Sequence, residues 1–299
     1  MTRARHSMQS LLRFALVLLL AVGIALAGSH GGVHYLGWPV FALCAALAFA
    51  VQWLAFVPAY LRQTEKFYDL TGSATYLAVV WLAVGLGGAT DIRSLLLAAC
   101  ISLWALRLGS FLFRRIHQDQ GDSRFDKIKP DASRFLFTWT LQGLWVVITA
   151  SCALAAITSG SEQSLGALGL MGTALWGAGF LIEVLADRQK RIFRQAQGSE
   201  QFINTGLWAR SRHPNYFGEI VLWCGIALIA VPALSGWQWL TLISPVFVFL
   251  LLTRVSGVPL LERKADQRWG ENPDYQRYKA KTPALVPLLR RPADEQRLP

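Results

Sequence analysis

Two of the arginines that lie inside or at the edge of long hydrophobic segments are candidates for chemistry, because a charge there is costly and usually functional. Arg107 lies well inside one such segment, and Arg254 lies at the end of the last one. One interpretation of Arg107 is an ion pair with Glu183 or Asp187 that holds helices together. The other is contact with a buried anionic ligand, for which a guanidinium is well suited because it can bind phosphate bidentately.

A row of charged residues follows the sixth hydrophobic segment at spacings of three and four. These spacings place the side chains on one face of a helix. The row consists of Glu183, Asp187, Lys190, Arg191 and Arg194. Because the helix begins in the apolar run 165–182, we expect its charged face to continue a face that looks into a helix bundle. A solvated helix end with internal ion pairs is the alternative.

The segment 204–219 is the most informative part of the chain. Proline is favoured in the first turn of a helix, so Pro214 is predicted to open the seventh long helix. The free N–H groups and the positive dipole end of that helix, beside Arg210 and Arg212, would form an anion-binding site. A capped helix behind a basic loop is the alternative. Two further polar residues lie along its first turns: Asn215 and Glu219.

The segment 254–278 is amphipathic, with aromatic residues placed among basic ones. Such a segment can lie on a membrane surface. Its aromatic side chains could equally stack on a ring, in which case the segment would cover a pocket that opens to the cytoplasm.

The elements that must position these residues are membrane-spanning helices. Of the 299 residues, 54% are hydrophobic and 16% are charged, and the mean hydropathy is +0.37. Each long hydrophobic run is near the ~20 residues that a helix needs to cross a membrane. The sequence therefore predicts an all-α polytopic membrane bundle of about eight transmembrane helices. The runs are 10–28, 36–60, 72–89, 94–115, 135–157, 165–187, 214–233 and 236–255.

The first run also resembles a signal peptide, since Arg3 and Arg5 precede it and Ala25-Leu26-Ala27 is a modest cleavage signature. Its length of about eighteen apolar residues favours an uncleaved helix.

The distribution of basic residues predicts the orientation of the bundle. With the N-terminus inside, nearly all cations fall in inner segments, and Arg93 is alone on the outer side. This agrees with the positive-inside rule. It accounts for the net charge of +11 without a nucleic-acid partner. Both termini are therefore predicted to be cytoplasmic, as are the segments 116–133, 189–212 and 256–299.

No metal site is predicted. The four cysteines lie inside hydrophobic runs without a CxxC pair, and His30 and His34 lack a third ligand. Transport is disfavoured because the buried charges gather at the cytoplasmic end and not at the midplane.

Three motifs resemble the steroid 5-alpha-reductase-like membrane proteins, and more narrowly the uncharacterised bacterial branch with the steroid 5-alpha-reductase C-terminal domain. They are QTEKFYDLTGS (63–73), RSRHPNYFGE (210–219) and LLERKADQRWGENPDYQRYKAKTPALVP (260–287). The resemblance covers residues 36–290. It leaves 1–35 as an extra transmembrane helix and 291–299 as a cytoplasmic tail, and it implies a bacterial inner-membrane protein.

This resemblance implies an enzyme that holds NADPH in a cytoplasm-open cavity and reduces an activated carbon–carbon double bond in a lipid or steroid-like substrate. The resemblance implies a carboxylic acid and a tyrosine that hold the substrate carbonyl, and Glu65 lies in the matching region. Trp104 stands where the family has its tyrosine, so Tyr68 is predicted as the second catalytic residue in its place. A carboxylic acid in this role must be protonated or share a proton, and a buried site is expected to favour this by raising its pKa. The predicted cofactor-binding residues are Arg107, Asp187, Arg194, Arg210, Arg212, His213, Asn215, Tyr216, Glu219, Arg254 and Glu262.

Two other functions stay open. Membrane methyltransferases that act on phospholipid or isoprenylcysteine carry a similar RHPxYxG motif followed by a glutamate, which Arg212–Gly218 and Glu262 also fit. They bind S-adenosylmethionine, which has no phosphate. A transporter or scaffold without enzymatic activity is the third possibility. Membrane lipids and a lipid-like small molecule are the expected partners.

Overall fold

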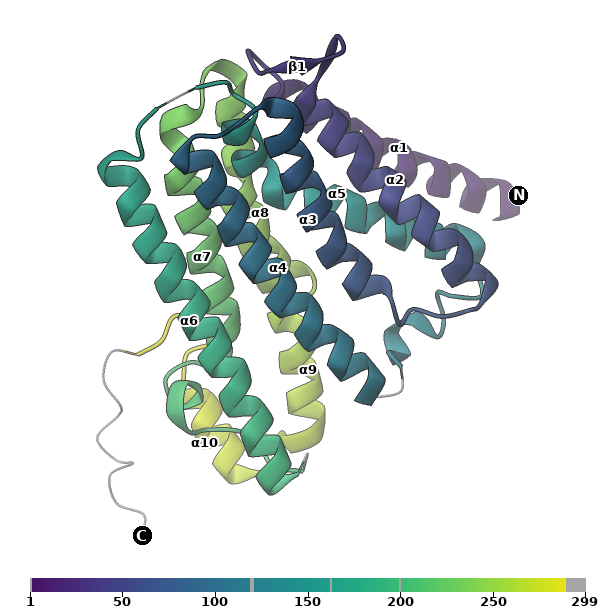
Figure 1. Ribbon diagram of the computed structural model, residues 1–299. Coiled ribbons are helices and arrows are strands. Elements are labelled where there is room, and N and C mark those ends of the chain that lie inside the picture. Colours follow the sequence, from purple (N-terminus) through teal and green to yellow (C-terminus); the bar gives the residue numbers. More distant parts are fainter. Residues whose placement is uncertain (1, 119–120, 162, 199, 289–299) are drawn as a thin grey trace. The chain divides into compact units, whose positions relative to one another are not determined.

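The computed structural model describes residues 2–118, 121–161, 163–198 and 200–288. Within these residues, eight helical segments are long and apolar enough to cross a membrane (Figure 1). The all-α, eight-helix prediction is confirmed, and the chain is an integral membrane protein. The segments are Met8–Gly28, Val40–Leu61, Tyr68–Gly87, Ile92–Ile116, Ala132–Ile157, Gly166–Gln197, Pro214–Ala233 and Gly236–Trp269.

The chain separates into two compact units, which are described one at a time. The first unit is Met1–Leu170 with Ile226–Ser244, and the second is Met171–Gly225 with Pro245–Pro299. The predicted domain limits at residues 35 and 290 stay predictions, and the predicted tail 291–299 lies outside the described residues.

The first unit is built around α5. This helix contacts α1, α2 and α3, and 83% of the residues in an apolar stretch of 18 residues within it are buried. A helix that is apolar on all sides is expected to be surrounded by its neighbours in this way. The elements are α1 (Thr2–Gly28), β1 (His34–Tyr35), β2 (Trp38–Pro39), α2 (Val40–Leu61), α3 (Tyr68–Gly87), α4 (Ile92–Gln118), η1 (Ser123–Phe125), α5 (Ala132–Ile157), η3 (Val231–Ala233) and η4 (Gly236–Leu242).

The second unit contains most of α6 and α7 and the C-terminal helices. Pro214 is the first residue of α7, as predicted. The elements are α6 (Gly166–Gln197), η2 (Gly206–Ala209), α7 (Pro214–Ala230), α8 (Ile243–Leu250), the π-helix η5 (Leu251–Val255), α9 (Val258–Trp269) and α10 (Pro273–Lys281).

The last hydrophobic run is not the single helix that was predicted. It begins as the 3₁₀-helix η4 and becomes α-helical only at α8. Pro245 has no N–H, so the carbonyl of Thr241, four residues earlier, lacks a helical donor. That carbonyl instead accepts a hydrogen bond of 2.8 Å from the Ser151 hydroxyl of α5.

Arg93, the only cation predicted on the outer side, is 1% exposed in the first unit. Its guanidinium donates hydrogen bonds to the carbonyl oxygens of Ile229, Ser164 and Leu165. Ile229 lies in the last turn of α7, where carbonyls lack helical partners and a cation is favourable. Arg93 thus serves as an internal helix cap, which explains why a basic residue is tolerated at this end.

In the second unit, α6 and α7 approach each other backbone to backbone. A Cβ at Gly218 would lie 2.6 Å from the Gly179 oxygen and 2.7 Å from the Glu183 nitrogen. Two turns further along, a Cβ at Gly225 would lie 2.6 Å from the Trp176 nitrogen. Small residues permit such close helix packing in membranes. The contact fixes the first turns of α7 beside the charged half of α6.

Gly218→Ala should therefore destabilise the protein by roughly 1–3 kcal/mol, because the methyl group meets backbone atoms that cannot rotate away. The melting temperature in detergent, followed by intrinsic fluorescence, measures the effect. Gly177→Ala on α6 is the matched control, since nothing lies within 4 Å of a Cβ there. Equal melting temperatures for the two variants would contradict the close packing.

Candidate functional site

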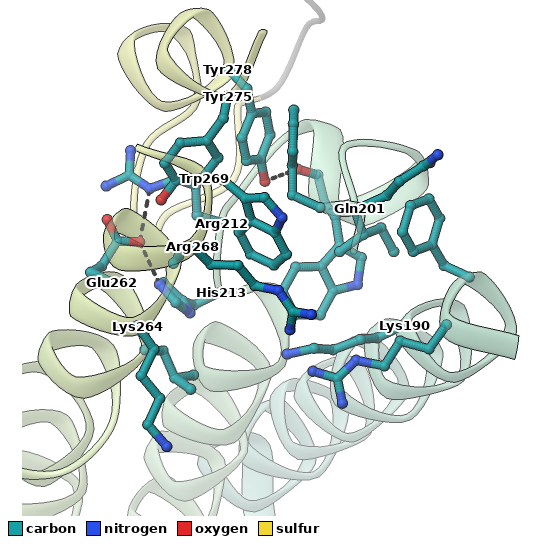
Figure 2. A pocket seen from close by; sticks show the side chains of 17 residues that line it. Lys190, Gln201, Arg212, His213, Glu262, Lys264, Arg268, Trp269, Tyr275 and Tyr278 are labelled. Carbon is teal, nitrogen blue, oxygen red and sulfur yellow. Dashed lines mark hydrogen bonds and ion pairs between the residues drawn. The ribbon is translucent and has the colours of Figure 1, made fainter. Parts of the chain in front are cut away.

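The second unit contains a cavity of about 270 Å³ whose wall combines basic and aromatic side chains (Figure 2). It is lined by the end of α6, the loop that leads to α7, and the helices α9 and α10. Its basic residues are Lys190, Arg194, Arg212, Lys264 and Arg268. Its aromatic residues are Phe193, Phe202, Trp208, Trp269, Tyr275 and Tyr278, and His213 and the carboxylate of Glu262 also line it.

Glu262 of α9 joins two sides of this cavity. Its Oε1 accepts hydrogen bonds from Arg212 Nε at 3.0 Å and from His213 Nε2 at 2.8 Å (Figure 2). Arg212 Nη1 also donates to the carbonyl oxygens of Lys279, at 2.8 Å, and Thr282, at 2.6 Å. Hydrogen bonds that involve charged groups are the strong ones. The loop before α7 is therefore held against both C-terminal helices.

Further hydrogen bonds fix the aromatic wall. Trp208 Nε1 donates to the Ala186 carbonyl at 3.0 Å, and the Tyr278 hydroxyl donates to the Trp208 carbonyl at 2.7 Å. The ring of Phe202 lies against Tyr275 and Tyr278, with centroids 5.3 and 5.5 Å away. The segment 254–278, predicted to lie on the membrane surface or to cover a pocket, thus supplies a wall of this cavity.

The basic residues of the cavity are only partly neutralised. Arg212 is paired with Glu262, and Arg268 forms an ion pair of 2.6 Å with the exposed Glu200. Within the described ranges, Arg194 and Lys264 have no carboxylate partner. The cavity therefore carries an excess of positive charge that favours an anionic ligand.

His213 is buried and is neutral at pH 7. Burial lowers its pKa, and the neighbouring cations Lys190 and Arg212 lower it further, which together outweighs the opposite effect of Glu262. Because a carboxylate only accepts, Nε2 carries the proton and Nδ1 is left as an acceptor. Among the described residues, His213 Nδ1 and the neighbouring Asn215 Oδ1 are buried without a hydrogen-bond partner.

The structure brings four of the predicted cofactor-binding residues to one cavity: Arg194, Arg212, His213 and Glu262. Four more belong to the second unit but do not line the cavity. Asp187 lies on α6, one turn before Lys190. The other three lie on the first turns of α7: Asn215, Tyr216 and Glu219. Arg210 and Arg254 have exposed side chains and do not line the cavity either. Arg107 belongs to α4 of the first unit, with its guanidinium 5.6 Å from the centroid of the Phe111 ring.

Glu65 differs from its prediction. Its carboxylate accepts hydrogen bonds from Lys129 Nζ at 2.6 Å and from the Asp122 N–H at 2.9 Å. Burial raises the pKa of Glu65, but these hydrogen bonds and the charge of Lys129 outweigh it and lower the pKa overall. The expectation that burial raises the pKa of Glu65 is therefore wrong for this structure, because Lys129, which pairs with the carboxylate, comes from another loop.

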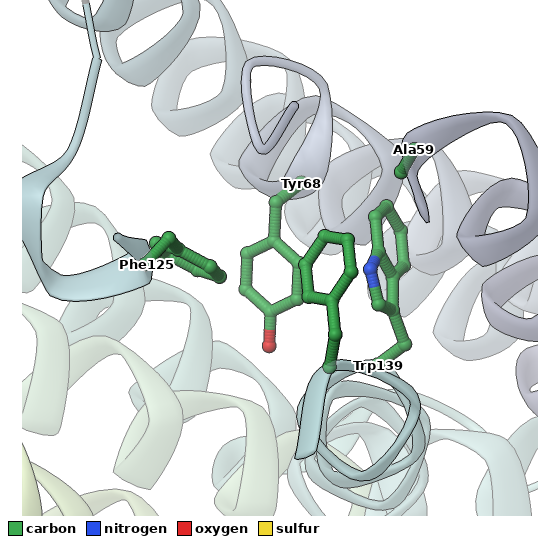
Figure 3. Close-up of a cluster of buried hydrophobic side chains, with 5 residues drawn as sticks. Ala59, Tyr68, Phe125 and Trp139 are labelled. Carbon is green, nitrogen blue, oxygen red and sulfur yellow. The ribbon is translucent and has the colours of Figure 1, made fainter. Parts of the chain in front are cut away.

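Tyr68 lies nearby in an aromatic cluster of the first unit (Figure 3). Its ring packs edge-on against Trp139 and Phe125, with centroids 5.0 and 5.1 Å away. Its hydroxyl donates to the Thr138 carbonyl at 3.0 Å. Tyr68 thus contributes to the core of the first unit, and its catalytic role stays a prediction.

Comparison with known proteins identifies the family. Residues 55–282 match the family described as "Protein of unknown function (DUF1295)". The chain belongs to this family. An uncharacterised protein of Schizosaccharomyces pombe is 25% identical over 76% of this chain and 72% of its own length. No solved structure matches.

This DUF1295 protein also shares a local similarity with bovine 3-oxo-5-alpha-steroid 4-dehydrogenase 1. The two are 37% identical over 84 residues, which is 28% of this chain and 30% of the bovine protein. The resemblance to the reductase family therefore rests on a limited part of the chain.

Some residues of the cavity were not predicted. Phe202 and Trp208 lie outside the three motifs, and Arg268 lies within the motif 260–287 but had no assigned role. The available signal for Trp208 was its place two residues before the motif 210–219. In the described part of the chain, no three His, Cys, Asp or Glu residues gather as a metal site would require.

We predict that Lys129→Met destabilises this DUF1295 protein by about 2 kcal/mol at neutral pH, since Glu65 loses a charged hydrogen-bond partner. The pKa of Glu65 is lowered from 4.5 and that of Lys129 is raised from 10.5. The pair therefore stabilises the fold between these values; its contribution is lost as the pH falls below 4.5 or rises above 10.5.

Melting temperatures of wild type and variant between pH 3 and 11 measure this contribution. Lys127→Met is the matched control, because Lys127 is an exposed lysine in the same loop. A melting-temperature difference that does not change with pH would contradict the ion pair.

Proposed function

We propose that this protein is a membrane-embedded, NADPH-dependent reductase of an activated carbon–carbon double bond in a lipid or steroid-like substrate. The proposal rests on the charge of the cavity in the second unit, which is lined by five basic side chains and one carboxylate. The local similarity to a bovine 3-oxo-5-alpha-steroid 4-dehydrogenase supports the same class of chemistry.

The residues of the cavity fit a dinucleotide with several phosphates. Arg194 and Lys264, which lack carboxylate partners within the described ranges, would bind phosphate oxygens. The aromatic wall, with Trp269 and Tyr275, would pack against a nucleotide ring. The unpartnered Nδ1 of His213, which lines the cavity, would receive a hydroxyl or amino hydrogen. S-adenosylmethionine carries a sulfonium and no phosphate, so this positive cavity suits it poorly.

When bound, NADPH supplies a hydride to the carbon beta to the substrate carbonyl, and a proton must reach the neighbouring carbon. Glu65 and Tyr68 remain the groups that we propose near this carbonyl. Because Glu65 is ionised and hydrogen-bonded to Lys129, the ammonium of Lys129 is the member of this pair that carries a proton. Proton donation by this pair would therefore begin at Lys129, with Glu65 holding it in place.

We also propose that the cofactor enters from the cytoplasm. The cavity is lined by residues from 190–213 and 261–278, which belong to segments whose positive charge favours the cytoplasmic side. Both termini would then be cytoplasmic.

Binding measurements on the purified protein in nanodiscs test the cofactor. We expect saturable binding of NADPH, and the double variant Arg194→Gln/Lys264→Gln should weaken it roughly 10- to 100-fold per lost phosphate contact. The matched control is Arg191→Gln/Arg263→Gln, which removes exposed neighbouring cations that do not line the cavity.

The control variant should bind NADPH like wild type. Equal weakening by both double variants would indicate a general effect of charge and not a site. Saturable binding of S-adenosylmethionine without binding of NADPH would replace the reductase by the methyltransferase alternative.

A further inference from the structure

The connection between α1 and α2 forms a small hairpin that lies outside the residues matched by the DUF1295 family. Its strands pair antiparallel, with Tyr35 opposite Trp38. Residues opposite each other in such a ladder place their side chains on the same face. One face of the hairpin therefore carries two neighbouring aromatic rings, which are 44% and 66% exposed.

The tip of the hairpin is unusual for a turn in water. Leu36 and Gly37 form the two-residue turn, with φ of 50° and 82°. Turns of this type favour Asn, Asp or Gly at both positions, and a leucine with positive φ is strained. Leu36 is nevertheless 84% exposed. A strained conformation that leaves an apolar side chain largely exposed is expected where something outside the chain covers that side chain.

A second exposed aromatic segment lies beside the base of this hairpin. The Gln238 side chain of η4 donates to the Gly28 carbonyl at the end of α1, at 3.4 Å. A Cβ at Gly236 would lie 2.5 Å from the His30 ring. On η4, Trp237 and Trp239 are both exposed. All of these residues belong to the first unit.

Neither segment contains the charges that a water-exposed loop of this length usually has. Residues 14–61 contain no Asp, Glu, Lys or Arg, and neither do residues 220–253. The apolar surface of α1, on which Leu19 and Leu26 are exposed, continues into the hairpin without a charged boundary. Tryptophan and tyrosine are the residues enriched where a membrane protein meets the headgroup region.

We propose that the hairpin 34–39, together with η4, is a membrane-interface anchor that inserts Leu36, Tyr35 and Trp38 into the headgroup–acyl boundary of the bilayer. Its partner is the lipid of the leaflet at this end of the first unit. Because the anchor is uncharged, it binds zwitterionic and anionic lipids alike, in contrast to anchors that depend on basic residues.

A nitroxide spin label tests the location of the tip. Leu36→Cys is labelled in a background in which the four cysteines, at positions 44, 100, 152 and 224, are replaced by alanine. The full-length protein is placed in phosphatidylcholine nanodiscs. Collision rates of the label with oxygen, which concentrates in lipid, and with a water-soluble nickel chelate are then measured. Trp38→Cys is labelled in parallel, in case the Leu36 variant does not fold.

Two positions of the same unit serve as references: Leu19→Cys on the exposed apolar face of α1 and Gln163→Cys in the exposed connection after α5. We expect oxygen-to-nickel ratios at positions 36 and 38 several-fold above that at 163 and approaching that at 19. Ratios equal to that at 163 would overturn the proposal by placing the hairpin in water. Low collision rates with both reagents would overturn it by showing that protein, for example a second copy, covers the hairpin.

The role of leucine at the tip can be separated from its backbone strain. Leu36→Asn suits the positive φ better, so the turn itself should persist. A label at position 38 in this variant should become several-fold more accessible to the nickel chelate if Leu36 anchors the hairpin. Unchanged accessibility would overturn the part assigned to Leu36. Exchanging phosphatidylcholine for phosphatidylglycerol should leave all ratios unchanged, and a strong dependence on lipid charge would contradict an uncharged anchor.

Discussion

The arrangement of the second unit depends on the hydrogen bonds that the carboxylate of Glu262 accepts. This carboxylate binds Arg212 and His213 from the loop before α7, and Arg212 in turn binds two carbonyl oxygens at the end of α10. This network attaches the C-terminal helices to a segment some fifty residues earlier in the chain. A partly buried network of this kind is costly when a member is missing and specifies one arrangement when complete. Without it, the basic and aromatic walls of the cavity would not face each other.

One short motif performs several of these tasks, which explains its spacing. Arg212 and His213 bind Glu262, Pro214 starts α7, and Asn215 lies in its first turn. Gly218, one turn further, brings α7 into backbone contact with α6. The motif thus joins the charged half of α6, the start of α7 and the C-terminal helices within seven residues. Substitutions in it would change both the packing and the cavity, so stability and binding have to be measured together.

Local patterns in the sequence were sufficient to predict the helices and part of the site. Hydrophobic length identified all eight spanning segments, and the first-turn preference of proline identified the start of α7. Features that depend on residues far apart in the sequence could not be predicted from local patterns. The ionised state of Glu65 requires Lys129, which is 64 residues away. The aromatic wall requires Phe202 to meet Tyr275 and Tyr278, and no local pattern signals that contact. The 3₁₀ start of the last run lies just before Pro245, whose missing N–H leaves the Thr241 carbonyl to the distant Ser151 hydroxyl.

The central claim is that the cavity of the second unit is where the nucleotide cofactor binds. Hydrogen–deuterium exchange of the full-length protein in nanodiscs, with and without saturating NADPH, tests it most directly. We predict slower amide exchange in peptides covering 200–213 and 258–278, and no change in a peptide covering the hairpin 34–39. The account would be contradicted if NADPH bound saturably and slowed exchange in other segments, but not in 200–213 and 258–278.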